Sequence, residues 1–306
     1  MDEALLAGFL ASAVRVSTPL LLAATGETVT ERSGVINLGI EGAMLAGALA
    51  AALGAAAGGV WLGTASAVLA GVAMSAVFAA VAIGGRADQV ITGTAVTLAS
   101  IGLTGVLYRR AFGAGGPGLS LPTFGVVRIP GLEGIPVLGD GLFAQPALTY
   151  LAWLLVPLCW WLLFRTPWGL SLRATGEAAE AARAAGVRVM GVQVTATLIG
   201  GALAGLAGGS LVLAQVGTFA EKMTAGRGFI AIAIVVLGRW HPVGALAAAL
   251  LFGGLQALQF VFQAMGLDVP YQLFLMLPYV LTLLALAGAV GRTRAPAELG
   301  RGSGER

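Results

Sequence analysis

The residues of this chain that could do chemistry share one setting: each is a polar, charged or aromatic group near glycines or at the start of an apolar run. They are Asn37, Glu41, Gln89, Thr92, Arg227 and Phe229. Polar groups at membrane depth are expensive and usually face a cavity or a partner group. Because amide, hydroxyl and carboxylate groups there can hydrogen-bond a polar solute, this set predicts a pathway for a solute through a membrane.

Catalytic constellations are absent from the sequence. It has no Walker A motif, so the usual phosphate-binding loop for ATP is missing. The glycines at 113–118, GAGGPG, match G-x-G-x-x-G only formally, because they follow no predicted strand and open no helix. His241 and Cys159 are the only histidine and cysteine, which excludes a disulfide and a cysteine–histidine metal cluster. We therefore expect no enzyme activity and no cofactor in this chain.

The composition is that of a membrane protein. Hydrophobic residues make up 58 % of the 306 residues and charged residues only 10 %, whereas soluble domains carry about 25 % charged residues. The mean hydropathy is +0.92. The net charge of +3 comes almost wholly from arginine, with no basic patch interleaved with aromatics, so nucleic acid is not an expected partner.

Long apolar runs predict an all-α, polytopic integral membrane protein with about eight to ten membrane helices. Gly201, Gly205 and Gly209 recur every four residues in one run, which predicts close packing against another helix. The predicted spans are 4–25, 43–59, 61–84, 89–108, 147–164, 189–216, 243–265 and 271–290.

Two further stretches are apolar but too short to span, and we interpret them as interrupted or re-entrant segments. The first, 27–42, has only about half of the 20 residues that a membrane helix needs. The second lies between Arg227 and Arg239, where about ten uncharged residues cover roughly 15 Å. Arg227 is expected to hold this segment by donating to freed carbonyls or to a carboxylate such as Glu41. Unwound backbone of this kind can line a pathway.

The charged island at 165–188 fixes the predicted orientation. Short loops rich in arginine stay on the cytoplasmic side, so the island is a cytoplasmic loop. Its alanine-rich part, 175–185, predicts one short helix with Glu177 in its first turn and Gly186 as the glycine after its end. Such a helix, joined rigidly to spans on both sides, could dock a partner.

The remaining polar parts follow from this orientation. The glycine- and proline-rich loop 113–146 is placed outside, although Arg109 and Arg110 precede it against the charge rule. The permease domain covers 1–291, and the basic tail 292–306 is predicted to be cytoplasmic and disordered. We interpret Asp88, Glu221 and Lys222 as interfacial residues or members of salt bridges.

Four long motifs, in order along the chain, resemble the permease subunits of bacterial ABC importers in the branched-chain amino acid, ribose and nucleoside group. The closest subgroup is the shorter permease of nucleoside importers served by a lipoprotein of the basic-membrane-protein type. The motifs are PLLLAATGETVTERSGVINLGIEGAMLAGA (19–48), DQVITGTAVTLASIGLT (88–104), LRATGEAAEAARAAGV (172–187) and MTAGRGFIAIAIVVLGRWHPVGA (223–245).

The resemblance implies roles for particular positions. One set matches the cytoplasmic segment that couples such a permease to its ATPase: Gly176, Glu177, Ala181, Ala182 and Gly186. A second set matches the interrupted segments beside the substrate pathway, which are Asn37, Gly39, Glu41 and Gly42 in the first, and Gly226, Arg227, Gly228 and Phe229 in the second. Apart from the resemblance, the aromatic rings of Phe229 and Trp240 are candidates for stacking on a base.

The resemblance also implies an assembly in the bacterial inner membrane. Its other parts are a second, longer permease subunit, a cytoplasmic ABC ATPase that binds ATP and magnesium, and an external substrate-binding lipoprotein. The expected cargo is a nucleoside, which suits a pathway of asparagine, glutamine and threonine with little net charge.

Three alternatives stay open. Riboflavin or a simple sugar could replace the nucleoside as cargo. An ion-coupled secondary transporter would work alone and would need a titratable group inside the membrane, for which Glu41 is the strongest candidate. A purely structural scaffold would not need two interrupted polar segments.

Overall fold

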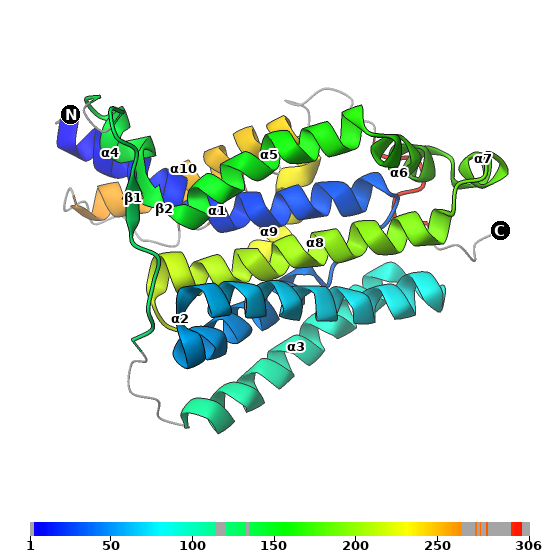
Figure 1. Cartoon of the computed structure of the whole chain (residues 1–306), viewed down its shortest axis with the longest axis horizontal. Coiled ribbons are helices and arrows are strands. Elements are labelled where there is room, and N and C mark those ends of the chain that lie inside the picture. Colours follow the sequence, from blue (N-terminus) through cyan, green and yellow to red (C-terminus); the bar gives the residue numbers. More distant parts are fainter. Residues whose placement is uncertain are drawn as a thin grey trace.

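The computed structural model describes residues 3–113, 120–132, 135–264 and 295–301, with the single positions 273, 276 and 280, and it confirms the all-α membrane fold. Within these residues, six helices are long and apolar enough to cross a membrane, and most of them run side by side (Figure 1). They are α1 (Glu3–Arg32), α2 (Ile40–Phe78, extended by a π-helical turn η1, Ala79–Gly84), α3 (Gln89–Phe112), α5 (Ala147–Arg165), α8 (Val189–Leu211, extended by a π-helical turn η2, Val212–Val216) and α10 (Pro242–Ala264).

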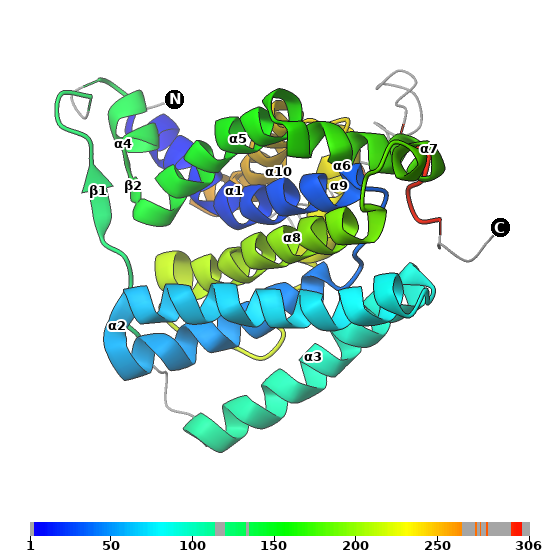
Figure 2. The same cartoon turned by 45° about the vertical axis from the view of Figure 1, so that its right-hand side comes forward.

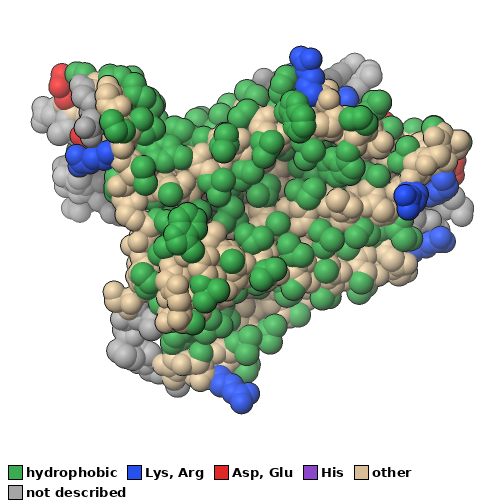
Figure 3. Space-filling view, in the orientation of Figure 1, with side chains coloured by type: hydrophobic (Ala, Val, Ile, Leu, Met, Phe, Trp, Pro, Cys, Tyr) green, Lys and Arg blue, Asp and Glu red, His purple; other side chains and the backbone are tan. Residues whose placement is uncertain are grey.

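Side chains on the outside of the bundle fit a lipid environment. Hydrophobic side chains cover the middle of the face in Figure 3, and charged ones lie towards its edges. Ile91 on α3 and Leu69 on α2 expose 71 % and 68 % of their surface. They belong to a long series of exposed large apolar side chains on the helices, and extended apolar surface of this kind is rare on soluble monomers but expected against lipid or a membrane partner.

Helix α2 is a hairpin of two antiparallel helices. Gly58 and Gly59 leave helical geometry, and Gly59 has φ +85°, a conformation that favours glycine. The chain reverses direction at these two glycines. The reversal brings the two arms together, and a methyl group on Gly54 would lie only 2.9 Å from Cα of Gly63. The two spans predicted at 43–59 and 61–84 are therefore confirmed. If α2 is counted as two helices and the short apolar helix α9 (Arg227–Leu237) is added, the described residues contain eight membrane helices. This number is the lower end of the predicted range.

Helix α8 packs into the groove of this hairpin, as the predicted glycine ridge requires (Figure 2). A methyl group on Gly47 would lie 2.6 Å from Cα of Gly205, and one on Gly205 would lie 2.9 Å from Cα of Gly71. Both arms of the hairpin thus touch the same glycine of α8. Backbones can approach this closely only where side chains are absent.

The loop at 113–146 carries the only strands in the described part of the chain. Strand β1 (Val126–Arg128) pairs antiparallel with β2 (Ala144–Pro146), and the short helix α4 (Leu138–Leu142) lies between them. The hydroxyl of Tyr150 donates to the carbonyl of Val127 at 3.1 Å and fixes the pair on α5. The N-terminus lies at this end of the molecule and the C-terminus at the other, beside α6 (Pro167–Glu177) and α7 (Ala179–Ala184) (Figure 1).

The charged island folds as two helices, where the sequence predicts one. Thr166 caps α6 by accepting a hydrogen bond from the Gly169 amide at 3.0 Å, with Pro167 in the first turn. Ala178, at φ −155° and ψ 82°, breaks the helix before α7 begins. Glu177 therefore ends α6 and does not start a helix. The expected glycine at the end of the island is confirmed, because Gly186 follows α7 with φ +86°.

The structure describes only parts of the last predicted span, 271–290, and of the predicted tail, 292–306. The predicted span at 271–290 lies outside the described residues, apart from the three single positions. Of the tail predicted to be disordered, residues 295–301 form turns that hydrogen-bond to the bundle, since the Glu298 amide donates to the carbonyl of Gly176 at 2.9 Å. Residues 302–306 lie outside the described part.

Candidate functional site

The carboxylate of Glu41 joins the two interrupted segments. Its Oε1 accepts hydrogen bonds from the Thr224 hydroxyl at 2.6 Å and from the Gly226 amide at 2.9 Å. Its Oε2 accepts from the Gly228 amide at 2.7 Å. Gly226 is the N-cap residue of α9, so a side chain of α2 satisfies the amides that open another helix.

Two helix N-termini meet at this carboxylate. Glu41 is the second residue of α2, and its oxygens bind the first turn of α9. Each helix N-terminus carries roughly half a positive charge, so one buried carboxylate balances two dipoles. This junction of Glu41 with the first turns of α2 and α9 is buried, because only 6 % of Glu41 is exposed. The start of α2 also packs on α3, since a methyl group on Gly42 would lie 2.9 Å from Cα of Thr97.

Arg227 closes the turn that precedes α9. Its Nη1 donates to the carbonyls of Met223 at 2.9 Å and Thr224 at 3.3 Å. This is the first of the two bonding modes expected from the sequence, donation to freed carbonyls. The turn includes Lys222 and Ala225, whose backbone φ angles are +60° and +47°. Residues other than glycine rarely adopt positive φ angles. Arg227 therefore stabilises an unwound and strained segment.

Side chains also satisfy the unwound backbone at 33–39, between α1 and α2. The Asn37 side-chain oxygen accepts from the Gly39 amide at 3.0 Å, and the Gln89 side-chain oxygen accepts from the Ile36 amide at 2.8 Å. The hydroxyl of Thr97 donates to the carbonyl of Leu38 at 3.1 Å. Buried backbone groups need such partners. Thr92, also a predicted site residue, is buried on α3.

Two buried carboxylates that sequence reasoning missed lie beside this loop. Helix α1 continues to Arg32 and contains Glu27 and Glu31, so the first interruption is shorter than the predicted segment 27–42. Glu27 Oε1 accepts from the Asn37 amide at 3.1 Å, and Glu31 accepts from the indole nitrogen of Trp240. Because these carboxylates face protein donors, the helix can extend past them. Their spacing of four residues on an apolar helix was the available signal.

The two aromatic residues expected to stack on a base have different surroundings. Phe229 on α9 is 48 % exposed, and Trp240 is only 4 % exposed. The side chain and the backbone of Trp240 both form hydrogen bonds. Its indole nitrogen donates to Glu31, and its carbonyl accepts from Arg32 Nε at 2.8 Å. Trp240 thus fixes the corner after α9 to the end of α1, and the expectation that it stacks on a base is wrong.

The residues predicted to couple to an ATPase gather at the α6–α7 end, but they are of two kinds. Glu177, Ala181 and Gly186 are exposed. Ala182 is buried, and Gly176 packs on α1, where a methyl group on it would collide with the carbonyl of Arg32. The first kind forms a surface and the second fixes that surface to the bundle.

Two arginines and a histidine surround Phe164 near the same end. The guanidinium carbons of Arg173 and Arg32 lie 5.0 and 5.9 Å from the centre of its ring, and the His241 ring lies 5.2 Å away. Burial, and then the positive charge of Arg32, lower the pKa of the His241 imidazole. His241 is thus uncharged at neutral pH, and the cluster joins α5, α6, α1 and the corner before α10.

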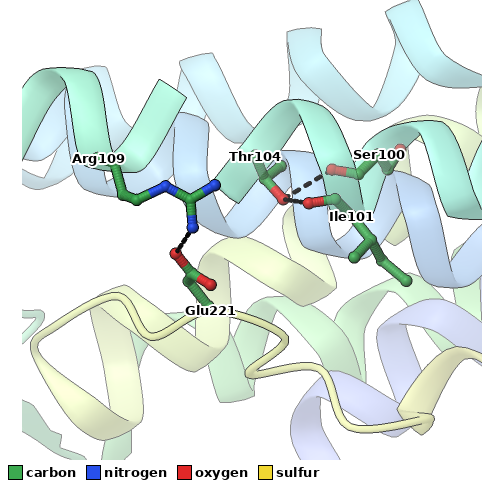
Figure 4. Close-up of polar contacts among 5 residues, drawn as sticks. All are labelled: Ser100, Ile101, Thr104, Arg109 and Glu221. Atoms are coloured by element: carbon green, nitrogen blue, oxygen red, sulfur yellow. Dashed lines mark hydrogen bonds and ion pairs between the residues drawn. The ribbon is translucent and has the colours of Figure 1, made fainter. Parts of the chain in front are cut away.

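An exposed salt bridge provides a partner for Arg109, which precedes the loop predicted to be external against the charge rule (Figure 4). Arg109 Nη1, near the end of α3, lies 2.9 Å from Glu221 Oε1 in the segment that leads to α9. One turn earlier, the Thr104 hydroxyl donates to the carbonyl of Ser100 at 2.7 Å and of Ile101 at 3.3 Å. The interpretation of Glu221 as a salt-bridge residue is confirmed. Both side chains are about half exposed, so the pair contributes little to stability.

The fold and this junction define a class of protein. Helices that begin inside a membrane bundle, with their N-termini held together by a buried polar group, are typical of membrane transport proteins. The chain belongs to the family of branched-chain amino acid transport system permease components, whose pattern matches residues 9–286.

Relatives named as ABC transporter permeases agree with this membership. The chain is 39 % identical to the guanosine ABC transporter permease protein NupQ of Bacillus subtilis, over 92 % of this chain and 91 % of the relative. It is 38 % identical to the putative glucose ABC transporter permease protein TsgC13 of Haloferax volcanii, over 94 % and 93 %. It is 34 % identical to the nucleoside ABC transporter permease protein NupC of Lactococcus lactis, over 92 % and 91 %. No solved structure matches the chain.

Family membership and the six apolar helices of the described residues establish the general role. The chain is a permease subunit of an ABC importer and a multi-pass integral protein of the plasma membrane. Its relatives are membrane permeases and not catalytic subunits.

Proposed function

We propose that this chain forms the translocation pathway of an ATP-driven nucleoside importer. The observation that carries the proposal is that two permeases named for guanosine and nucleosides match more than nine tenths of the chain. The polar groups near the junction support it, since amides and hydroxyls can hydrogen-bond an uncharged, polar cargo.

The proposed assembly has three further kinds of subunit. A second, longer permease completes the pathway, an external lipoprotein delivers the nucleoside, and a cytoplasmic ABC ATPase binds ATP and magnesium. In this arrangement α6 and α7 face the cytoplasm and the loop 113–146 faces outward. The exposed ring of Phe229 then lies on the side of α9 that is open to the second permease and the cargo.

The proposed coupling route runs from the cytoplasmic surface to the junction. The ATPase pushes on the exposed side chains of α6 and α7, including Glu177. Gly176 transmits the movement to the end of α1, on which it packs. The loop 33–39 follows α1 directly and leads to Glu41, which holds α9 by its first turn. A shift of the coupling surface thereby reaches both interrupted segments, and the pathway changes the side to which it opens.

The cargo is tested by competition. Cells or vesicles that carry the complete importer take up labelled guanosine, and unlabelled nucleosides, glucose or riboflavin are added at a hundredfold excess. We expect nucleosides alone to reduce the uptake of label by more than tenfold. Equal uptake with and without excess nucleoside would contradict the proposed cargo.

A sugar importer is the second candidate. It is favoured by the 38 % identity to the putative glucose permease of Haloferax volcanii, which is nearly as high as that to the guanosine permease. Uptake of labelled glucose that is reduced by excess glucose, and not by excess nucleoside, would establish this alternative.

A further inference from the structure

We propose that residues 295–301, here called the strap, are a positioning element that holds the coupling surface on the first interrupted segment while the importer works. The strap lies beside α6 at the end where the C-terminus emerges (Figure 1). This inference rests on the proposed function, because it assigns the strap to the route between the ATPase and the junction.

The strap connects two places that are far apart in the sequence. The Glu298 amide donates to the carbonyl of Gly176 in α6 at 2.9 Å, and the Gly300 amide donates to the carbonyl of Gly34 at 3.2 Å. Gly34 is the second residue of the unwound loop 33–39, and Gly176 belongs to the predicted coupling set. Two backbone hydrogen bonds therefore tie the coupling surface to the first interrupted segment.

The surroundings of the strap are shaped to receive it. A methyl group on Gly34 would lie 3.3 Å from Cβ of Glu298, and one on Gly300 would lie 2.9 Å from Cδ1 of Ile36. Both glycines have positive φ, at +89° and +74°, which favours glycine at each position. Pro296 is buried. A loosely associated tail would need neither close contact nor positive φ on both sides.

The strap also forms its own turns, so it can act as a stiff piece. The Leu299 amide donates to the carbonyl of Pro296 at 3.0 Å, and the Arg301 amide donates to the carbonyl of Glu298 at 3.1 Å. Leu299 packs on the main hydrophobic core. A stiff piece bonded at two points adds to the packing of Gly176 on Arg32 and Gly34, and so makes the coupling surface and the loop 33–39 move together.

Two shortened chains give the first test, each assembled with the complete importer. One ends at residue 301 and keeps the strap, and the other ends at residue 294 and lacks it. We expect the longer chain to match the full chain in uptake and ATP hydrolysis. The shorter chain should co-purify with the ATPase and hydrolyse ATP within about twofold of the full chain, but take up at least fivefold less cargo per ATP. Equal uptake per ATP in both chains would overturn the inference.

A pair of point variants decides the matter if the shorter chain does not assemble. Glu298→Pro removes the amide that donates to Gly176, and the matched Glu298→Ala removes the same side chain but keeps the amide. We expect uptake per ATP to fall at least threefold in Glu298→Pro relative to Glu298→Ala, with equal melting temperatures of the purified assemblies. Equal uptake per ATP in the pair would contradict a positioning role.

The full chain separates this inference from the proposed function. If it shows no ATP-dependent uptake of nucleoside, the proposed function fails and takes the strap's role with it. If it imports nucleoside, and the chain without the strap does so with the same uptake per ATP, only the inference fails.

Discussion

At the scale of single residues, Glu41 is the side chain that joins the two interrupted segments. The sequence identifies it as a rare carboxylate in an interrupted segment, and the structure gives it the amides of Gly226 and Gly228 and the hydroxyl of Thr224. These partners lie more than 180 residues away, so no local pattern could have named them.

The first prediction concerns this carboxylate. Glu41→Gln keeps the shape but sets an amide group against backbone donors that need an acceptor. Hydrogen bonds to charged groups contribute about 1.5–3 kcal/mol each, so we expect a loss of stability of that order and a lower melting temperature in detergent. Glu221→Gln is the matched control, because that side chain is half exposed and contributes at most about 1 kcal/mol. Equal melting temperatures for the two variants would contradict the role given to Glu41.

Other residues show where sequence reasoning stops. Asn37 and Gln89 were predicted to line a pathway, and both are occupied with amides of the first interrupted loop. Glu27 and Glu31 were missed because their partners, Asn37 and Trp240, come from other elements. Whether any of the predicted pathway residues touches cargo stays a prediction.

At the scale of elements, the glycines of α8 decide how the bundle packs. The four-residue spacing predicted a packing ridge, and the structure places Gly205 between both arms of the α2 hairpin. The break in the charged island was not predictable in the same way. Residues 175–185 have high helix propensity throughout, yet α6 ends at Glu177, where Gly176 packs on the end of α1. Tertiary contact overrides propensity there.

The second prediction follows from this packing. Gly205→Leu places a side chain where the backbones of α8 and α2 touch, and separating them exposes the core. We expect little or no monodisperse protein after extraction in detergent. Gly102→Leu in α3 is the matched control, because a methyl group there meets nothing within 4 Å. A normal yield of Gly205→Leu would show that the close contact is dispensable.

The third prediction concerns the coupling surface. Glu177 is exposed at the end of α6 and lies near the charge of Arg32, and Glu177→Lys reverses its charge. We expect the variant to insert into the membrane normally but to lose most ATP-driven uptake, because the charge faces the proposed ATPase. Arg183→Glu is a useful companion, since it reverses an exposed charge of opposite sign on α7. Unchanged uptake by Glu177→Lys would remove that residue from the coupling role.

At the scale of the whole molecule, the class of fold could be predicted from the sequence. Apolar spans and arginine-rich loops are local patterns, each contained in one continuous stretch of residues. Seven spans and both interruptions follow from those patterns alone. The lateral arrangement could not be predicted, because glycine contacts such as Gly47 with Gly205 join helices that are distant in sequence. The strap was missed for the same reason, since the tail 292–306 that contains it is basic and its partners lie far away in the sequence.

The most direct test of the account is reconstitution. The chain is incorporated into liposomes with its second permease, the ATPase and the binding lipoprotein, and guanosine uptake is measured with ATP, without ATP, and under a proton or sodium gradient alone. The account predicts uptake that needs ATP and all four components, with no uptake driven by either gradient. Uptake by this chain alone under an ion gradient would contradict it, and Glu41 would then be the first residue to examine as an ion-coupling group.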